Sequence, residues 1–358
     1  MATALFFFTR AMAGRGRQMD ARVAAEWFRE GEQQVRAGDL KRAIESFRKA
    51  TSNDSDNRQY VIALANALAA AGHDEEARQA LLRLRETSPE NAQINLYLAR
   101  LAAKRGDVAE TTRYYENALY GLWTGTQVDE ERRKVRVELI RFLLDHDQRS
   151  GALSEALVLG TESPLDDPGA QTEAGQLLLE AGDAQHALKY FMRVIALNRT
   201  NAVALAGAGN AAFQLGNYVE ARRYLEAALA ESPKLASGAQ LLTLTKMILS
   251  HDPLEPYLRR EERNRRLLAD FEQSHRRLQS CLEQQSGKKY DLQALQADAQ
   301  EMQPELRPKN LQHDPELLRA GMELICKIEQ ATSVGCGDPA ELDRALLLIC
   351  RKHSGALE

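Results

Sequence analysis

Glycines recur at a spacing of 34 residues along most of this chain. Gly38, Gly72 and Gly106 show the interval near the N-terminus, and Gly182 and Gly216 show it again further on. Because glycine readily adopts the left-handed backbone conformation that ends a helix, each position predicts a tight turn between two helices. A fixed period of this length, with two helices in each period, indicates a helical repeat array in which units stack in one dimension.

Side chains at fixed distances from each turn glycine follow one pattern. Small residues stand seven positions before the turn and five after it, as Ala65 and Ala77 do around Gly72. A large apolar residue stands nine positions after each turn: Phe47, Leu81, Tyr115, Phe191 and Leu225. Antiparallel helices approach closely only where side chains are small, and larger groups fill the gaps beside them. The register therefore predicts an all-α fold of packed helix pairs.

This pattern resembles the tetratricopeptide repeat (TPR) family. In the first unit the resemblance is carried by Trp27, Gly31, Gly38, Ala43, Phe47 and Ala50. The same register sets units at 24–57, 58–91, 92–125, 133–166, 168–201 and 202–235. The fourth unit is degenerate because Asp147 replaces its turn glycine, and residues 126–132 separate it from the third unit as a longer loop or a helix extension. The resemblance implies a right-handed α-solenoid of about six helix-turn-helix repeats.

The remaining segments divide the chain into four parts. We expect residues 1–20 to be a disordered or leader-like extension, and 24–250 to be the solenoid, with 236–250 as its capping helix. Residues 254–303 predict a long charged helix region, because Leu267, Phe271, Leu278 and Leu282 form one apolar stripe among charged neighbours. We expect 304–358 to be a proline-bearing linker followed by a small helical tail, which resembles no family that we recognise.

The TPR resemblance implies a concave face that is lined by the first helix of each unit and binds a peptide or a partner protein. The candidate partner-binding residues are Ile62, Asn66, Leu96, Arg100, Lys104, Lys134, Arg141, Gln176, Asn210 and Phe213. Asn66 and Asn210 are expected to hold the backbone of an extended peptide. The basic members in the middle units favour an acidic partner.

The four cysteines, Cys281, Cys326, Cys336 and Cys350, lie in the last third of the chain and form no CxxC pair. Four cysteines in a chain of this length do not predict a disulfide framework, and we expect them to be buried or incidental thiols. A zinc site built from three of them and His353 is disfavoured because zinc ligands usually come in close pairs. We assign no catalytic residue, no metal site and no cofactor, because no P-loop, HExxH or GxSxG motif occurs.

The sequence thus predicts a soluble protein–protein interaction scaffold or adaptor and not an enzyme. The alternative is a regulatory or targeting subunit of an enzyme or envelope-assembly complex, with a second activity in the tail. A net charge of -4 gives no sign of nucleic-acid binding, and no run of apolar residues is long enough to predict a transmembrane helix. The compartment stays open: cytoplasmic is favoured, or periplasmic or envelope-associated if residues 1–19 are part of a leader. The oligomeric state is not predicted.

Overall fold

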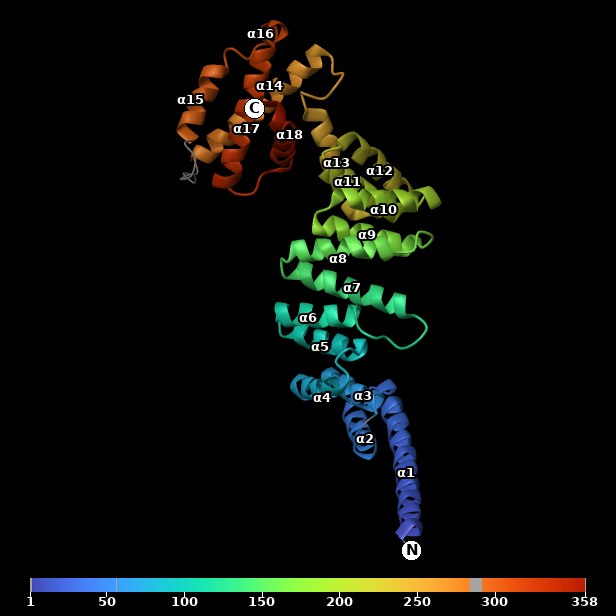
Figure 1. Cartoon of the computed structure of the whole chain (residues 1–358). Coiled ribbons are helices and arrows are strands. Elements are labelled where there is room, and N and C mark those ends of the chain that lie inside the picture. The colour runs from blue at the N-terminus through green and yellow to red at the C-terminus, as the bar shows by residue number, and fades with distance from the viewer. Residues whose placement is uncertain (1, 56, 284–291, 358) are drawn as a thin grey trace. The chain divides into compact units, whose positions relative to one another are not determined.

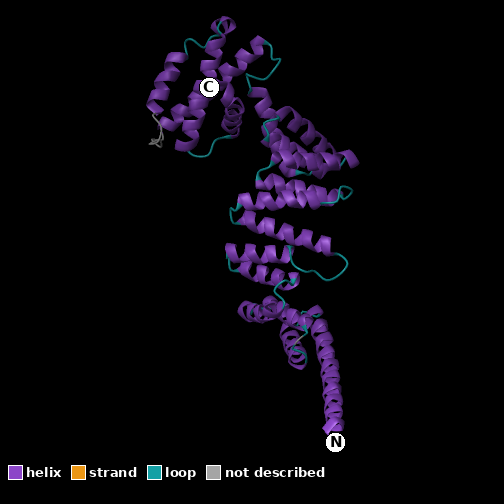
Figure 2. Ribbon diagram, viewed as in Figure 1, coloured by secondary structure: helices purple, strands orange, loops and turns teal. Residues whose placement is uncertain are grey.

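The structure is a computed structural model, and it describes residues 2–55, 57–283 and 292–357. These residues form eighteen α-helices and no strand (Figures 1 and 2). The chain divides into two compact units, residues 1–163 and 164–358. No helix among the described residues is long and apolar enough to cross a membrane.

Helix pairs build the whole of the first unit. The helices are α1 (Ala2–Arg36), α2 (Leu40–Asn53), α3 (Arg58–Ala70), α4 (Asp74–Thr87), α5 (Ala92–Lys104), α6 (Val108–Leu119), α7 (Val128–Asp145) and α8 (Arg149–Glu162). Each helix packs on the next, from α1 with α2 to α7 with α8. The extra residues between the third and fourth repeats lengthen α7 at its N-terminus, which was one of the two expected outcomes.

The second unit continues with helix pairs and ends in a different arrangement. Its repeat helices are α9 (Pro168–Ala181), α10 (Ala184–Leu197), α11 (Ala202–Gln214), α12 (Tyr218–Glu231) and the capping helix α13 (Ala236–His251). Five helices follow: α14 (Arg260–Glu283), α15 (Leu292–Met302), α16 (Pro308–His313), α17 (Pro315–Gly335) and α18 (Glu341–Leu357). We call residues 260–357 the C-terminal module. Within it α17 packs on α14, and α18 packs on α17 and on α13.

The predicted turn positions all carry the left-handed backbone. The five turn glycines have φ between +71° and +98°, from Gly106 to Gly182. Asp147, which replaces the glycine of the fourth repeat, also has a positive φ of 59°. Aspartate is among the few residues that tolerate this conformation because its short polar side chain forms local hydrogen bonds. The prediction that the fourth repeat keeps the register is therefore confirmed.

Small residues let the helices of each pair approach, as the sequence predicted. Ala43, Ala77 and Ala221 are fully buried, and the large residues nine positions after the turns are at most 4% exposed. The ring of Phe191 shows how tight this packing is. A Cβ atom on Gly175 of α9 would lie 2.9 Å from the ring, and one on Gly207 of α11 would lie 2.4 Å from it. Glycine is required at Gly207 because any side chain there would overlap the ring.

Two expectations about the ends of the chain need correction. The disorder expected for residues 1–20 is wrong, because the backbone is helical from Ala2 as part of α1. These residues are rich in alanine, methionine and arginine, which favour helix. A leader-like role for this segment stays a prediction. The four cysteines were expected to be free thiols, but they form two disulfide bonds, Cys281–Cys336 and Cys326–Cys350. The sequence SGKK at residues 286–289 also predicts a break in the charged helix, and these residues lie outside the described part of the chain.

Candidate functional site

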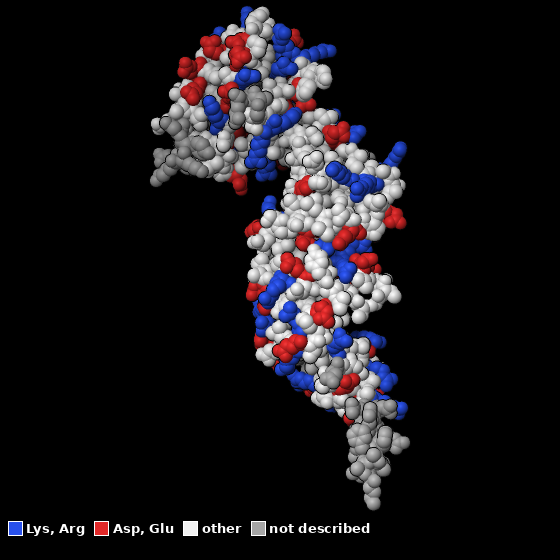
Figure 3. Space-filling model, viewed as in Figure 1, with Lys and Arg blue, Asp and Glu red and all other residues white. Residues whose placement is uncertain are grey.

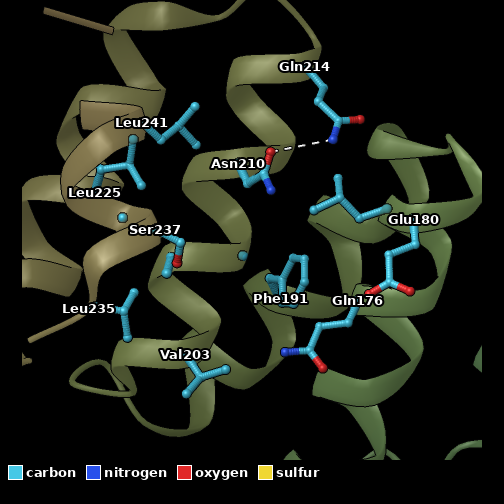
Figure 4. Close-up of a pocket in the computed structure, with 14 residues that line it drawn as sticks. Gln176, Glu180, Phe191, Val203, Asn210, Gln214, Leu225, Leu235, Ser237 and Leu241 are labelled. Carbon is cyan, nitrogen blue, oxygen red and sulfur yellow. Dashed lines mark hydrogen bonds between the residues drawn. The ribbon is translucent and has the colours of Figure 1, made fainter. Parts of the chain in front are cut away.

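A groove of about 470 Å³ opens between α9, α11 and α13 in the second unit. Its residues are drawn in Figure 4 and comprise Gln176, Leu179, Glu180, Phe191, Val203, Ala206, Gly207, Asn210, Gln214, Leu225, Leu235, Ser237, Gly238 and Leu241. We call this the α11 groove. Space is left because α11 presents Ala206 and Gly207 to the groove, while Phe191 from α10 and Leu225 from α12 fill the positions behind them.

Amide side chains supply most of the polar groups of the α11 groove. Gln176 projects from α9, and Asn210 and Gln214 project from α11 toward the same space (Figure 4). The Nε2 atom of Gln214 donates a hydrogen bond of 3.4 Å to Oδ1 of Asn210. In the described part of the chain, the amide of Gln176 and the Nδ2 atom of Asn210 form no hydrogen bond. An amide both donates and accepts, so these two side chains match the alternating N–H and C=O groups of a peptide backbone.

Apolar side chains form the walls of the α11 groove. Val203 is 48% exposed, and Leu235 and Leu241 face the same space from the start of the capping helix. Of the residues that line the groove, only Glu180 carries a charge. An apolar groove with a few placed polar groups is typical of a ligand-binding surface. The arrangement suits a neutral extended peptide with an apolar side chain.

The first unit carries a second groove, formed by two adjoining pockets of about 410 and 210 Å³. Asn66 and Ala70 of α3 line both pockets. One pocket is completed by Glu32, Val35, Arg36, Leu40, Phe47, Ala63 and Ala67, and the other by Ala65, Ala69, Leu81, Tyr97, Arg100, Leu101 and Lys104. We call this the α3 groove.

Carboxylates of the same unit pair with two of the three basic side chains of the α3 groove, Arg100 and Lys104. Arg100 makes a bidentate contact with Glu138 of α7, at 3.0 and 2.7 Å, and Lys104 lies 2.8 Å from Asp74 of α4. The hydrogen bonds that Arg100 donates to Glu138 raise the pKa of its guanidinium. Burial and the Glu138 charge raise the pKa of the neighbouring Tyr115 hydroxyl. On the face shown in Figure 3, acidic and basic side chains are interspersed along the repeats, so no single sign of charge dominates there.

The structure places the ten candidate residues in different settings. Gln176 and Asn210 line the α11 groove, and Asn66, Arg100 and Lys104 line the α3 groove. The other five line neither: Ile62, Leu96, Lys134, Arg141 and Phe213.

Packing removes the apolar members of this set from the surface. Ile62 and Leu96 are 7% and 5% exposed because they face the interior of their helix pairs. Phe213 packs edge-on against Tyr218, with 5.3 Å between ring centroids. Lys134 and Arg141 are exposed on α7, where Lys134 pairs with Glu130 and Glu131 of its own helix.

Sequence reasoning missed several residues of the grooves. Gln214 lies four positions after Asn210, hence one turn further along the same helix face, and this spacing could have identified it. Val203 and Tyr97 carry no comparable signal, because only the packing of neighbouring first helices shows that they border a groove.

The C-terminal module has a groove of its own between α15 and α17. It has a volume of about 360 Å³ and is rimmed by Asp298, Glu301, Glu305, Glu323 and Lys327 over the apolar residues Met302, Leu317, Ala320 and Leu324. Among the described residues no group of three or more His, Cys, Asp or Glu side chains could hold a metal ion. His353 contacts Asp252, so it does not join the cysteines in a zinc site.

Comparisons with known proteins agree with this architecture. A family model described as tetratricopeptide repeat matches residues 34–101 and 178–244. No curated protein matches the chain. The helix pairs joined at left-handed turn residues define an α-solenoid repeat protein. The two stretches that the family model matches, residues 34–101 and 178–244, are tetratricopeptide repeats.

Solved structures of other repeat proteins are similar in fold. YrrB, described as a TPR protein with an unusual peptide-binding site, is 20% identical with a TM-score of 0.43, covering 55% of this chain and 97% of its own. A tetratricopeptide repeat protein from Parabacteroides merdae is 14% identical with a TM-score of 0.43, covering 85% and 99%. PilW, described as a type IV pilus biogenesis factor, is 19% identical with a TM-score of 0.42, covering 62% and 98%.

Proposed function

We propose that this chain is a protein-binding scaffold whose α11 groove holds an extended, uncharged segment of a partner protein. The observation that carries the proposal is that the amide of Gln176 and the Nδ2 atom of Asn210, neither hydrogen-bonded within the described part of the chain, face one largely apolar space. The two residues are 34 positions apart and so occupy equivalent places in successive repeats. A repeating amide at this spacing suits the repeating backbone of a bound peptide.

The walls of the groove supply affinity and the amides supply orientation. Val203, Leu235 and Leu241 offer apolar surface to one or two side chains of the partner. Burial of apolar area drives association at roughly 25 cal/mol per Å² before the costs of ordering the partner. The groove lining holds no lysine or arginine, so no basic side chain there would bind the C-terminal carboxylate of a partner protein.

A pair of matched valines tests the proposal. Val203 lines the α11 groove and is 48% exposed, whereas Val219 on α12 is 49% exposed and lies outside the groove. We would capture partners of the full chain from its native cells, identify them by mass spectrometry, and measure the affinity of a purified partner for Val203→Glu and Val219→Glu. Loss of one hot-spot contact costs roughly 2 kcal/mol, or about thirtyfold in Kd.

The proposal predicts that Val203→Glu weakens binding at least tenfold and that Val219→Glu changes it less than twofold. Both variants carry the same charge change at the same exposure, so a general effect of charge or stability affects both. Equal loss in the two variants, or no loss in Val203→Glu, would refute binding in this groove.

The acidic partner expected from the basic residues is a second proposal, for the α3 groove. Such a partner would have to displace Glu138 from Arg100 and Asp74 from Lys104. Arg100 and Lys104, the two candidate basic residues that line the α3 groove, changed together to glutamate test it by the same capture experiment. A set of captured proteins identical to that of the unmodified chain would sink this second proposal and leave the α11 groove untouched.

A further inference from the structure

All four cysteines of the chain lie in the C-terminal module, and the repeats contain none. The Cys281–Cys336 bond joins the end of α14 to the residue after α17, with Cα atoms 5.6 Å apart. The Cys326–Cys350 bond joins α17 to α18, with Cα atoms 5.5 Å apart. Because the first bond spans 281–336 and the second spans 326–350, the two loops overlap. Together they connect α14, α17 and α18 covalently.

The core that these bonds enclose is costly to fold. Asp270, Ser274 and Glu329 are fully buried, and Asp343 is 5% exposed. Ser274 donates a hydrogen bond of 2.6 Å to Oε1 of Glu329, but Oε2 of Glu329 and Oδ2 of Asp270 have no hydrogen-bond partner. Buried polar atoms without partners destabilise a fold. Small helical modules with weak cores are commonly stabilised by disulfides.

The repeats have a different interior. Their contact positions are alanines, glycines and large apolar residues that are almost completely buried, as at Ala187, Phe191 and Ala221. Each repeat packs on its neighbours without help from a covalent bond. Among the described residues, the C-terminal module therefore combines buried carboxylates with cross-links, whereas the repeats have no buried carboxylate and no cysteine.

The Cys326–Cys350 bond also acts on the end of the solenoid. Two residues after Cys350, Lys352 lies 2.9 Å from Oδ2 of Asp252, the residue that follows α13. His353 lies 3.0 Å from the same oxygen, and Asp252 is fully buried. Lys352 also stands over the ring of Tyr218 on α12, 5.7 Å from its centroid. The bond thus holds α18 where it covers the last apolar surface of the repeats.

We propose that oxidation of the four cysteines completes the cap of the solenoid, and that this chain works in an oxidising compartment. Each bond forms when two thiols lose two protons and two electrons. The acceptor is a disulfide of a thiol–disulfide exchange partner, which passes through a mixed disulfide and leaves as a dithiol. Disulfides of this kind persist outside the reducing cytosol.

The first arm of the test is the thiol state of the chain in its native cells. Cells are quenched in acid, the denatured protein is alkylated with N-ethylmaleimide, and non-reduced peptides are read by mass spectrometry. The proposal predicts no alkylated cysteine and two linked pairs, Cys281–Cys336 and Cys326–Cys350. Four alkylated cysteines, or any other pairing, would overturn it.

The second arm is hydrogen exchange of the full purified chain with and without a phosphine reductant. Reduction is expected to lower the protection of α13 and α18 at least tenfold and to leave α9–α11 unchanged. The Cys326→Ser/Cys350→Ser variant should show the reduced pattern in α13 without reductant. The Cys281→Ser/Cys336→Ser variant should keep α18 on α13. Unchanged α13 protection on reduction of the unmodified chain refutes the cap, even if neither variant folds.

Discussion

The buried carboxylate of Glu329 on α17 predicts a gain in stability when its charge is removed. Glu329 is fully buried, and burial raises its pKa to about 7 from an ordinary 4.5. Each pKa unit is worth 1.36 kcal/mol, so ionised Glu329 costs the folded chain about 3 kcal/mol relative to the unfolded chain. Arg277 lies 3.5 Å from its Oε2 atom, but the same guanidinium is 2.6 Å from Asp343 and is shared between them.

The sign of the effect follows from the raised pKa. The folded chain holds the proton of Glu329 more tightly than the unfolded chain does, so this group favours folding below pH 4.5. That advantage is lost as the pH rises from about 4.5 through about 7. Above this range the free-energy cost of the buried, ionised carboxylate no longer changes with pH. Glu329→Gln removes the titration and keeps an oxygen that accepts the hydrogen bond from Ser274.

We therefore expect Glu329→Gln to stabilise the C-terminal module by about 1–3 kcal/mol at pH 8 and to have little effect at pH 4. Urea unfolding, followed by hydrogen exchange of α14 and α17 across this pH range, measures the difference. Glu323→Gln is the matched control, since Glu323 lies on the same helix, is half-buried and forms no ion pair among the described residues. A Glu329→Gln variant that is destabilised at pH 8, or a difference that does not depend on pH, would refute the reasoning.

Two further substitutions test the repeats and the attachment of α18. Gly207→Ala would place a Cβ atom 2.4 Å from the Phe191 ring, so we expect the free energy of unfolding, measured by chemical denaturation, to fall by about 1–3 kcal/mol. The control is Gly151→Ala, which should be neutral or stabilising because its Cβ would meet only Leu143, at 3.4 Å. Equal effects of the two substitutions would contradict the packing account. For Asp252, burial alone would raise the pKa, but hydrogen bonds from His353 and Lys352 lower it below its ordinary value. Its contribution is therefore present above about pH 4 and is lost as the pH falls through the lower folded-state pKa. Asp252→Asn should release α18 from α13 at pH 7, seen as lost exchange protection, and its effect should shrink as the pH falls. An effect that does not decrease in acid would contradict the assignment.

The repeat register could be predicted because its causes are local and recur. Gly38, Gly72 and the other turn glycines are needed wherever the backbone turns left-handed, and small residues are needed wherever two helices approach. Even Asp147 could be placed, since the apolar positions around it kept the spacing. The family model independently matches two stretches of this pattern.

The charge pairing of the α3 groove could not be predicted from one repeat. Arg100 meets Glu138 across 38 residues, and Lys104 meets Asp74 across 30. Each partner lies on a helix of a neighbouring repeat, at a separation that differs from the period. Sequence spacing alone therefore identified the basic residues and missed the carboxylates that neutralise them.

The disulfides were predicted wrongly for a related reason. Cys281 and Cys336 are 55 residues apart, and Cys326 and Cys350 are 24 apart. Neither pair has a local motif, and Cys281, Cys326 and Cys350 sit on helix faces that also suit a buried thiol. Only the packing of α14, α17 and α18 brings the sulfur atoms together.

Photo-crosslinking at the α11 groove tests the central proposal most directly. A benzophenone amino acid is introduced at Val203 in one full-length chain and at Val219 in another, and both are irradiated in native cells. The two positions have matched exposure, on α11 inside the groove and on α12 outside it. We predict a covalent adduct with a partner protein at Val203 and none of the same mass at Val219. The same adduct at both positions, or at Val219 alone, would contradict binding in the α11 groove.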